Sequence, residues 1–589
     1  MAKKKSAKKK VSKKATKKTA TKTAKRTTKK AAKKTTKATR RGTSADDDGE
    51  VATKTTKKTR RAASLEPVTA ETLATRQKSI SVSEFFAKNR HLLGFDSPAR
   101  ALLTTIKEAV DNSLDACEEA QILPDVTVEL HQKAEDRFIV VVQDNGPGVT
   151  RAQVPRIFGR LLYGSKFHTR KQSRGQQGIG ISAAGMYGYL TTGKPILVTV
   201  RTSARSAAHR VSLTIDTAKN IAVVHRDEEV EVEWKRGTRI ELELEATYKK
   251  GKHSVDAFLE QVALANPHVQ ISYLAPGDKE PTVYERVTKS LPEPPKEILP
   301  HPHGVELGIL IKMLKDTKAK NLKSFLSSEF SRVTPAVADR IIEATGAGKK
   351  SDALRPTTRT STVSQKGSER LHQAIANTKL MAPPTNCLSP IGAELIEKAL
   401  KRNFEPDFLT SVTRAPSVYR GNPFQVECGL AYGGSIPGDE LATLYRFANR
   451  VPLQYQQSAC AMSKAVISVP WRNYEIQQSR GALPTAPLTI MVHIASVWVP
   501  FTSESKKAVA HYDEILKELR LALMDAGRKL AIHLRRRRRE ADAQRKYAYI
   551  EKYIPQIGLA LQDILELSDP QRDKAVKSLG TVLEKSRKM

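Results

Sequence analysis

The chain has 589 residues and a formal net charge of +38, so it is too long for one hydrophobic core and we expect two to four domains. Its four cysteines are scattered and form no C-x-x-C pair, which argues against a disulfide framework and a zinc site and favours a reducing interior. The longest uncharged apolar run, Ala486 to Phe501, is too short to span a bilayer as a helix. We therefore expect a soluble protein with no membrane partner.

The basic charge is concentrated at the N-terminus. Residues 1–61 hold 25 Lys and Arg against four acidic residues, a local charge of +21, which leaves +17 for the rest of the chain. Lys, Ala and Thr offer almost no apolar area to offset chain entropy, so we expect residues 1–65 to be a disordered arm. Its composition resembles that of linker-histone tails and predicts binding to nucleic acid, while a solubilising or localising segment is the alternative.

Residues 76–300 are expected to form a first α/β domain. A helix containing "KEAVDNSLDACEEA" is followed by the strand-like "VTVELHQKAEDRFIVVVQD", a Gly-rich stretch to about Gly193, and the strands "PILVTVRT", "RVSLTID" and "TRIELELEA". This order favours an α/β sandwich in which helices cover one face of a sheet. The Pro-dense stretch 290–304 marks the end of the domain.

Three further segments are expected after this linker. Residues 301–384 form a small helical unit, in which Thr334 caps a helix that begins at Pro335 and ends near Gly346. Residues 385–540 alternate strands with helices and form a second α/β domain, where the β-branched run from Ala486 to Phe501 is a buried strand. Residues 541–589 are a helical tail of one or two helices.

Glu108 and Asn112 lie four residues apart in the first predicted helix and therefore project side by side. Such a pair on its own is usually a solvated helix face. Beside a polyphosphate, however, the Asn112 amide oxygen can bind Mg²⁺, and Glu108 is placed to polarise a water toward the terminal phosphate.

Two Gly-rich motifs follow this helix and complete a candidate nucleotide site. In "QDNGPGV", Asp144 at a strand end can accept from a purine amino group, and Gly146 and Gly148 let the backbone lie beside the base. The second motif is "YGSKFHTRKQSRGQQGIGISAAGMYG", Tyr163 to Gly188. Within it, "RGQQGIGIS" opens a helix whose free N–H groups face phosphates. The residues predicted to bind the nucleotide here are Ser165, Lys166, Gly175, Gln176, Gln177, Gly178, Ile179, Gly180, Ile181 and Ser182.

The order of these three motifs resembles that of the GHKL ATPases, the superfamily of DNA gyrase B subunits, a heat-shock chaperone, mismatch-repair ATPases and histidine kinases. No G-x-x-x-x-G-K-[ST] sequence is present, so a P-loop is excluded. Histidine kinases of this superfamily usually lack a Glu at the position of Glu108, so the resemblance favours the branch that hydrolyses ATP.

Several longer stretches are similar to the B-subunit family of type IIB DNA topoisomerase VI. They include "SVSEFFAKNRHLLGFDSPARALLTTIKEAVDNSLDACEEA", "RGQQGIGISAAGMY", "HPHGVELG", "RFANRVPL" and "VWVPFTSESKKAVA". The resemblance implies a GHKL domain, a helix-two-turns-helix insert at 301–384 and a transducer domain at 385–540. It also implies that Lys506 reaches the γ-phosphate from the transducer, with Lys507 as the alternative, and that Thr238 lines the purine pocket.

The family likeness also implies cofactors and partners. They are ATP and Mg²⁺, double-stranded DNA, a second copy of the chain that dimerises with the first when ATP binds, and a DNA-cleaving A subunit in an assembly of two A and two B subunits. The expected function is ATP-driven relaxation or decatenation of DNA by duplex passage, in the cytoplasm or nucleoid, or in the nucleus of a eukaryote. A chaperone-like clamp on protein clients and a non-catalytic scaffold are the alternatives, and the run Arg535–Arg539 is either a DNA contact or a solvated helix face.

Overall fold

The computed structural model describes residues 69–166, 169–175, 178–346, 353–503 and 506–588. The predicted disordered arm lies outside these residues, as do Gln176 and Gln177 of the predicted phosphate loop. The chain divides into two compact units, Met1–Gln77 and Lys78–Met589. In the first unit, the described part contains helix α1 (Ala70–Arg76), whose N-cap Thr69 accepts from the backbone N–H of Thr72.

The first sheet of the larger unit has eight strands in the order β5-β4-β3-β6-β2-β1-β7-β8. Its neighbouring strands are antiparallel except for β1 and β7, which are parallel. The strands are β1 (Asp125–Ala134), β2 (Arg137–Asp144), β3 (Ile196–Arg201), β4 (Ala208–Asp216), β5 (Ile221–Val230), β6 (Gly237–Glu245), β7 (Gln270–Leu274) and β8 (Thr282–Tyr284).

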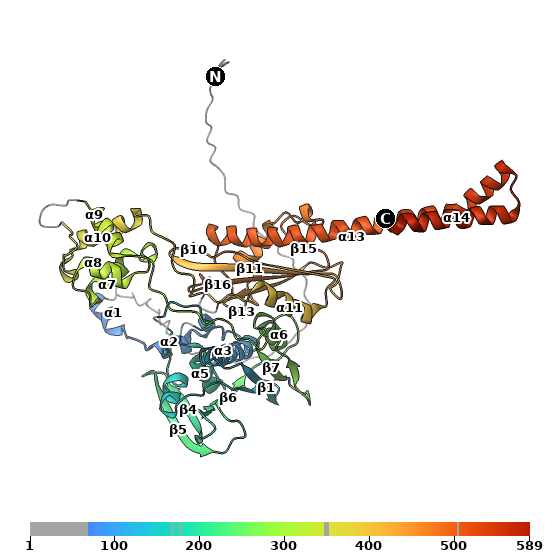
Figure 1. The fold of residues 1–589 in the computed structure, drawn as a ribbon. Helices are drawn as coiled ribbons and strands as arrows, with labels where there is room; N and C mark the ends of the chain where they lie inside the picture. Colours follow the sequence, from blue (N-terminus) through green and yellow to red (C-terminus); the bar gives the residue numbers. More distant parts are fainter. Residues whose placement is uncertain (1–68, 167–168, 176–177, 347–352, 504–505, 589) are drawn as a thin grey trace, which may run out of the picture. The chain divides into compact units, whose positions relative to one another are not determined.

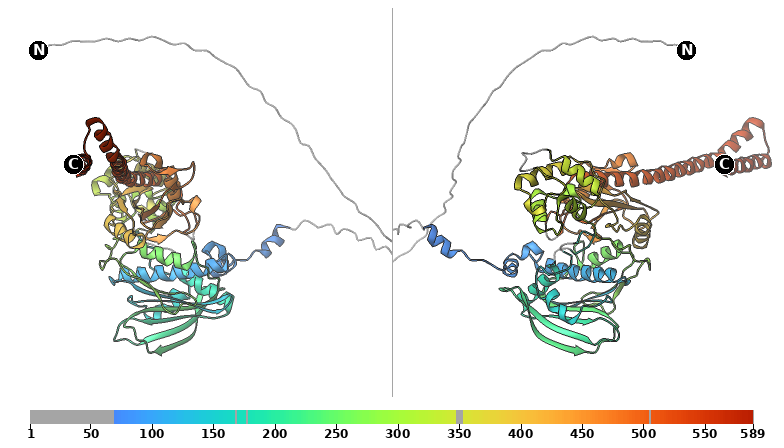
Figure 2. Two further views of the ribbon diagram at one scale, coloured as in Figure 1. Left: turned by 90° about the vertical axis from the view of Figure 1, so that its right-hand side faces the viewer. Right: turned by 60° about the vertical axis from the view of Figure 1, so that its left-hand side comes forward.

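Helices α3, α5 and α6 lie over one face of this sheet (Figures 1 and 2), which confirms the predicted α/β sandwich. Helix α3 buries Leu102, Ile106, Val110 and Leu114, one residue per turn, against the strands. Strands β5, β7 and β8 and helices α2, α4 and α6 were not predicted. The helices of this region are α2 (Val82–Lys88), α3 (Pro98–Glu119), α4 (Val154–Phe158), α5 (Gly180–Thr192) and α6 (Val255–Ala265).

A small helical region follows, with its own core around Phe325 and Phe330. Thr334 caps α9 by accepting from the backbone N–H of Val337, and Pro335 is the first helical residue, as predicted. The helix ends at Glu343, with Ala344 as its C-cap, and Gly346 lies in the turn just beyond with a φ of +71°. The helices here are α7 (Leu307–Asp316), α8 (Leu322–Glu329), α9 (Pro335–Glu343) and α10 (Gln365–Asn377).

The second sheet has the order β10-β11-β16-β12-β13, with β9 paired to β11. Every residue of β16 is buried, so the predicted buried strand is confirmed. Its strands are β9 (Phe408–Thr413), β10 (Ser417–Tyr419), β11 (Asn422–Tyr432), β12 (Thr443–Ala448), β13 (Val451–Pro452) and β16 (Leu488–Ser496), and a separate hairpin pairs β14 (Gln477–Gln478) with β15 (Pro484–Thr485).

Helices cover both faces of this second sheet (Figure 1). Leu430 of β11 packs in one core with α12 and α13, and the next residue, Ala431, packs in another core with α11 and with Leu264 of α6. The helices are α11 (Ala393–Phe404), α12 (Ala461–Ser468), α13 (Asp513–Leu565) and α14 (Asp569–Lys588). The second α/β sandwich is thus joined to the first through the α6–α11 core.

The run Arg535–Arg539 lies in α13 and is exposed. Arg537 pairs with Asp407 at 2.8 Å and Arg536 with Glu540 at 2.9 Å. This part of the helix is exposed to solvent and carries ion pairs. Among the described helices, none combines the length and the apolar character that crossing a membrane requires.

Candidate nucleotide-binding site

A cavity of about 590 Å³ lies above the ends of β2 and β6, between α3, the start of α5 and two segments of the second sandwich. It brings together most of the residues predicted from the three motifs. Those that line it are Glu108, Asn112, Asp144, Ser165, Lys166, Gly175, Gly178, Ile179, Gly180, Ile181, Ser182, Thr238 and Lys506.

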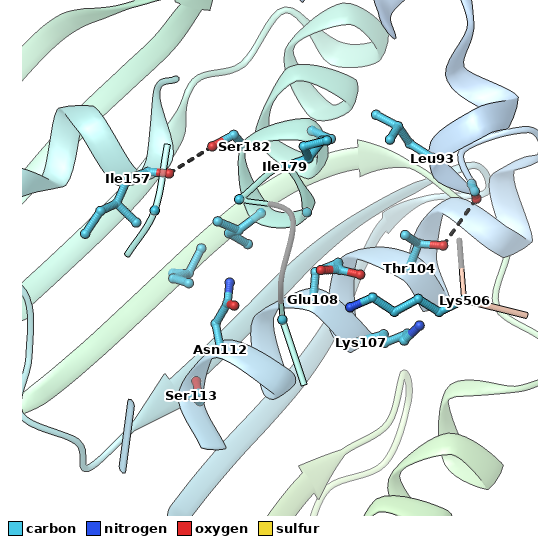
Figure 3. A pocket seen from close by; sticks show the side chains of 18 of the residues that line it. Leu93, Thr104, Lys107, Glu108, Asn112, Ser113, Ile157, Ile179, Ser182 and Lys506 are labelled. Atoms are coloured by element: carbon cyan, nitrogen blue, oxygen red, sulfur yellow. Dashed lines mark hydrogen bonds between the residues drawn. The ribbon is translucent and has the colours of Figure 1, made fainter. Parts of the chain in front are cut away.

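Glu108 and Asn112 extend from neighbouring turns of α3 into the same part of the cavity (Figure 3). Glu108 is half-buried and Asn112 is exposed to the cavity space. Gly180, the first residue of α5, lies so close that a Cβ atom at this position would overlap the Glu108 carboxylate. The absence of a side chain at Gly180 therefore allows the carboxylate and the start of the loop helix to lie together.

Asp144 is the last residue of β2 and is buried at the floor of the cavity. Its Oδ2 accepts from the Ser113 hydroxyl at 3.0 Å, and its Oδ1 accepts from the backbone N–H groups of Gly146 at 2.9 Å and Thr238 at 3.2 Å. Burial raises the pKa of the Asp144 carboxyl, and these three hydrogen bonds offset the rise only in part. The hydrogen bonds also fix the direction in which the carboxylate faces.

Gly146 and Gly148 lie in the turn directly after Asp144 and are not among the residues that line the described cavity. Gly146 donates its N–H to Asp144. Gly148 has a φ of +70°, and a Cβ there would overlap the backbone carbonyl of Arg201. The two glycines therefore shape the turn after β2.

The loop between α4 and α5 forms the wall opposite α3, but two of its predicted side chains are held by protein groups. Lys166 Nζ donates to Asp115 Oδ2 at 2.5 Å. The hydroxyl of Ser182, which follows the loop in the first turn of α5, shares its one proton between the carbonyls of Ile157 at 2.8 Å and Arg160 at 3.0 Å. The backbone at the start of α5 remains the part of the loop that faces the cavity, as expected for a helix N-terminus beside phosphates.

Lys506 and Lys507 both line the cavity, from the segment that precedes α13. Lys506 Nζ donates to the backbone carbonyl of Arg174 at 2.7 Å, so its side chain lies across the loop toward α3 (Figure 3). Lys506 also has a φ of +50°, a conformation that residues other than glycine seldom adopt. The second sandwich thus supplies a cation to a cavity that the first sandwich builds.

Sequence reasoning missed several charged residues around the cavity. Lys107 lines it directly beside Glu108, and Asp115 and Arg174 are buried just behind the loop. Asp115 lies one turn after Asn112, and Arg174 immediately precedes Gly175, so their positions in the motifs were visible. The partners of Asp115 could not be predicted, because it binds Lys166 and Arg174, which are 51 and 59 residues away.

Comparison with known proteins agrees with this geometry. Residues 98–248 match the family of histidine kinase-, DNA gyrase B- and HSP90-like ATPases. Residues 383–546 match the transducer of the topoisomerase VI B subunit. The first match contains the cavity floor, α3 and the loop, and the second contains the segment with Lys506.

Relatives over most of the chain carry the name of the B subunit of type 2 DNA topoisomerase 6. The one from Methanococcoides burtonii is 46% identical over 516 residues, which are 87% of this chain and 82% of that protein. The one from Pyrococcus horikoshii is 39% identical over 533 residues, 84% of this chain and 93% of that protein.

Among solved structures, the B subunit of DNA gyrase from Myxococcus xanthus is 13% identical, covers 77% of this chain and 96% of its own, and has a TM-score of 0.36. That score is too low to support an argument. Both relatives are more than 30% identical to this chain over more than four fifths of its length, and the chain therefore belongs to the family of type 2 DNA topoisomerase 6 B subunits.

Proposed function

We propose that this protein is the ATP-binding and ATP-hydrolysing B subunit of a type IIB DNA topoisomerase, in which ATP closes two B subunits into a clamp. A separate A subunit would cleave DNA, in an assembly of two A and two B subunits that passes one duplex through another. The single observation that supports this most is the cavity in which Glu108, Asn112 and the start of α5 meet Lys506 from the second sandwich.

Each group around the cavity has a chemical role in this proposal. Asp144 and Thr238 hold the purine, and the backbone at the start of α5 binds the phosphates. Glu108 is the general base that takes a proton from the attacking water, and Lys506 stabilises charge on the γ-phosphate. Asn112 presents its side-chain amide to the cavity, and the amide oxygen is a suitable ligand for Mg²⁺. Mg²⁺ would take its remaining ligands from phosphates and water and would neutralise phosphate charge.

The proposal is tested by reconstitution. The chain is purified together with an A subunit from the same source, and decatenation of linked circular DNA is measured with and without ATP. We expect decatenation that depends on ATP, and ATP turnover that DNA stimulates. Turnover stimulated by unfolded protein and not by DNA would favour the chaperone-like alternative.

ATP binding should depend on pH through Asp144. Its pKa is raised by burial, so protonation begins at a higher pH than for an ordinary carboxyl. A protonated carboxyl is a poorer acceptor for the purine amino group, and affinity should therefore be full above this pKa and fall as the pH drops through it. Titration calorimetry with a non-hydrolysable ATP analogue at a series of pH values measures the dependence.

Two variants separate Asp144 from other acidic groups. Asp144→Asn should bind the analogue weakly at every pH, with a flatter profile than the wild type. Asp136→Asn carries the same substitution at an exposed turn between β1 and β2 and should keep the wild-type profile. If Asp144→Asn retained both the affinity and the profile, the purine role would be wrong.

The basic arm, which lies outside the described residues, should supply part of the affinity for DNA. Each phosphate neutralised on a duplex contributes about −0.9 to the slope of log affinity against log salt. An arm that engages about six phosphates would therefore change the slope by roughly five units when residues 1–64 are deleted. The loss should not depend on DNA sequence, because contacts to phosphates carry no sequence information.

This prediction has a control of matched length. Full-length protein, the deletion and a variant whose arm lysines are replaced by Gln are compared for DNA binding at five salt concentrations. The Gln variant should behave like the deletion, and basal ATP turnover should be the same in all three. Equal slopes for all three proteins would contradict DNA binding and favour a solubilising or localising role.

A further inference from the structure

Arg174 lies at the point where the phosphate loop meets both α3 and the second sandwich. Its side chain is 4% exposed and its guanidinium donates to three different residues. Nη1 donates to Asp115 Oδ1 at 2.9 Å and to Glu118 Oε2 at 2.8 Å, while Nη2 donates to Glu118 Oε1 at 2.6 Å and to Asn266 Oδ1 at 2.5 Å. This paired contact with Glu118 is the planar recognition that arginine provides and lysine does not.

The acidic partners of Arg174 also hold the loop itself. Asp115 Oδ2 accepts from Lys166 Nζ at 2.5 Å and from the backbone N–H of Gly175 at 3.4 Å. Burial alone would raise the pKa of the Asp115 carboxyl, but the charges of Lys166 and Arg174 outweigh burial and hold the pKa below its ordinary value. Asp115 therefore stays ionised and ties two points of the loop to α3.

The main chain beside Arg174 is held from the other side by three segments of the second sandwich. The Gln172 amide donates to the Ser389 carbonyl at 3.0 Å and accepts from the Ser389 N–H at 2.7 Å. Asn449 Nδ2 donates to the Ser173 carbonyl at 3.0 Å. Lys506 Nζ donates to the Arg174 carbonyl at 2.7 Å. Three consecutive residues thus bind three separate parts of that sandwich.

A buried path connects these contacts to the guanidinium. Asn266, which accepts from Arg174, donates through Nδ2 to the Arg450 carbonyl at 3.4 Å. Arg450 in turn donates to the Ser389 carbonyl at 3.3 Å and to the Pro390 carbonyl at 3.0 Å. Ser389 is also the partner of Gln172. Ser389 is therefore connected to this segment twice, directly through Gln172 and indirectly through Arg450, Asn266 and the Arg174 side chain.

We infer that Arg174 is a positioning residue: its side-chain network fixes its backbone carbonyl, and this carbonyl aligns the Lys506 ammonium group in the cavity for the γ-phosphate of ATP. This inference rests on the proposed ATPase function. The lysine side chain is a flexible four-carbon stem, so its ammonium group is aligned only when an acceptor holds it at a constant position. The guanidinium network keeps the Arg174 carbonyl at such a position.

The inference predicts how substitutions combine. Arg174→Lys keeps the positive charge but cannot bond Asp115, Glu118 and Asn266 together. We expect it to lower kcat for ATP hydrolysis about tenfold, because Lys506 is no longer aligned. In a Lys506→Ala background the same change should lower kcat by less than about twofold, because its target is gone. The KM for ATP should rise in both backgrounds, since the loop is loosened in each.

Arg170→Lys is the matched control, the same substitution four residues earlier in the loop, at a half-buried side chain outside this network. It should leave kcat and KM near their wild-type values in both backgrounds. Asn266→Ser, which removes one acceptor of the guanidinium and keeps the acidic pair, should give a smaller kcat loss with the same dependence on Lys506. Thermal unfolding shows whether Arg174→Lys is folded, and if it is not, Asn266→Ser provides the same test.

The outcomes separate this inference from the proposed function. If the kcat losses of Arg174→Lys, or of Asn266→Ser, multiply with that of Lys506→Ala, the loop acts independently of Lys506 and the inference is overturned. A wild-type protein that does not hydrolyse ATP would contradict the proposed function itself, before any variant is compared.

Discussion

Replacing Glu108 with Gln should lower the rate of ATP hydrolysis by roughly 10²–10⁴-fold and leave ATP affinity almost unchanged. The substitution keeps the shape of a side chain that lies against Gly180 at the start of α5, so the cavity should persist. It removes the group that accepts a proton from the attacking water, which matters in the transition state and not in the bound state. The variant should accumulate as an ATP-bound closed dimer.

Steady-state hydrolysis, calorimetry with a non-hydrolysable analogue and size-exclusion chromatography with ATP measure these three properties. Glu135→Gln, at the exposed turn between β1 and β2, is the matched control and should behave as the wild type. Hydrolysis at a near-normal rate in Glu108→Gln would show that another group is the base.

Gly180→Ala offers an independent approach to the same side chain. Its new methyl group would overlap the Glu108 carboxylate and push it out of place. A fall in turnover in this variant, with the carboxylate still present, would show that the position of Glu108 matters and not only its charge.

Replacing Lys506 with Ala should lower turnover by about 10²–10³-fold, the usual loss when a preorganised group that stabilises transition-state charge is removed. ATP should still bind, because Asp144, Thr238 and the loop belong to the first sandwich. The ATP-driven closure of the second sandwich onto the first should weaken as well. Lys506 belongs to the second sandwich, and its ammonium group reaches the Arg174 carbonyl of the first.

Lys507→Ala is the natural comparison, because the neighbouring lysine also lines the cavity and was the alternative from the sequence. We expect a much smaller effect on turnover from this variant. X-ray scattering with and without the ATP analogue measures the closure. The same ATP-driven change in Lys506→Ala as in the wild type, or a larger loss in Lys507→Ala, would reject the role of Lys506.

Much of the local structure could be predicted from the sequence. The helical period placed Glu108 and Asn112 on one side of α3, and the structure has both in the cavity. The β-branched run from Ala486 predicted β16, and the order Thr334–Pro335 predicted the start of α9. These features depend on neighbours within a few residues, so hydrophobic period and cap chemistry are enough to reveal them.

Elements with a weaker local pattern were missed. Strand β5 is an edge strand whose residues are mostly exposed, so it lacks the apolar alternation of a half-buried strand. Strand β7 has only five residues, and its place in the sheet depends on parallel pairing with β1. Their existence is decided by pairing with distant strands and not by their own composition.

The contacts of the charged side chains were decided by the tertiary structure alone. Lys166 was predicted to bind the nucleotide and it lines the cavity, but the acceptor of its ammonium group is Asp115, 51 residues away. The carbonyl that binds Lys506 belongs to Arg174, 332 residues earlier in the chain. Residue type and spacing show that a lysine needs an acceptor. Which acceptor it finds depends on the distant groups that the packed sandwiches bring within hydrogen-bonding distance. Desolvation makes this pairing strict, because a buried charge without a partner is costly.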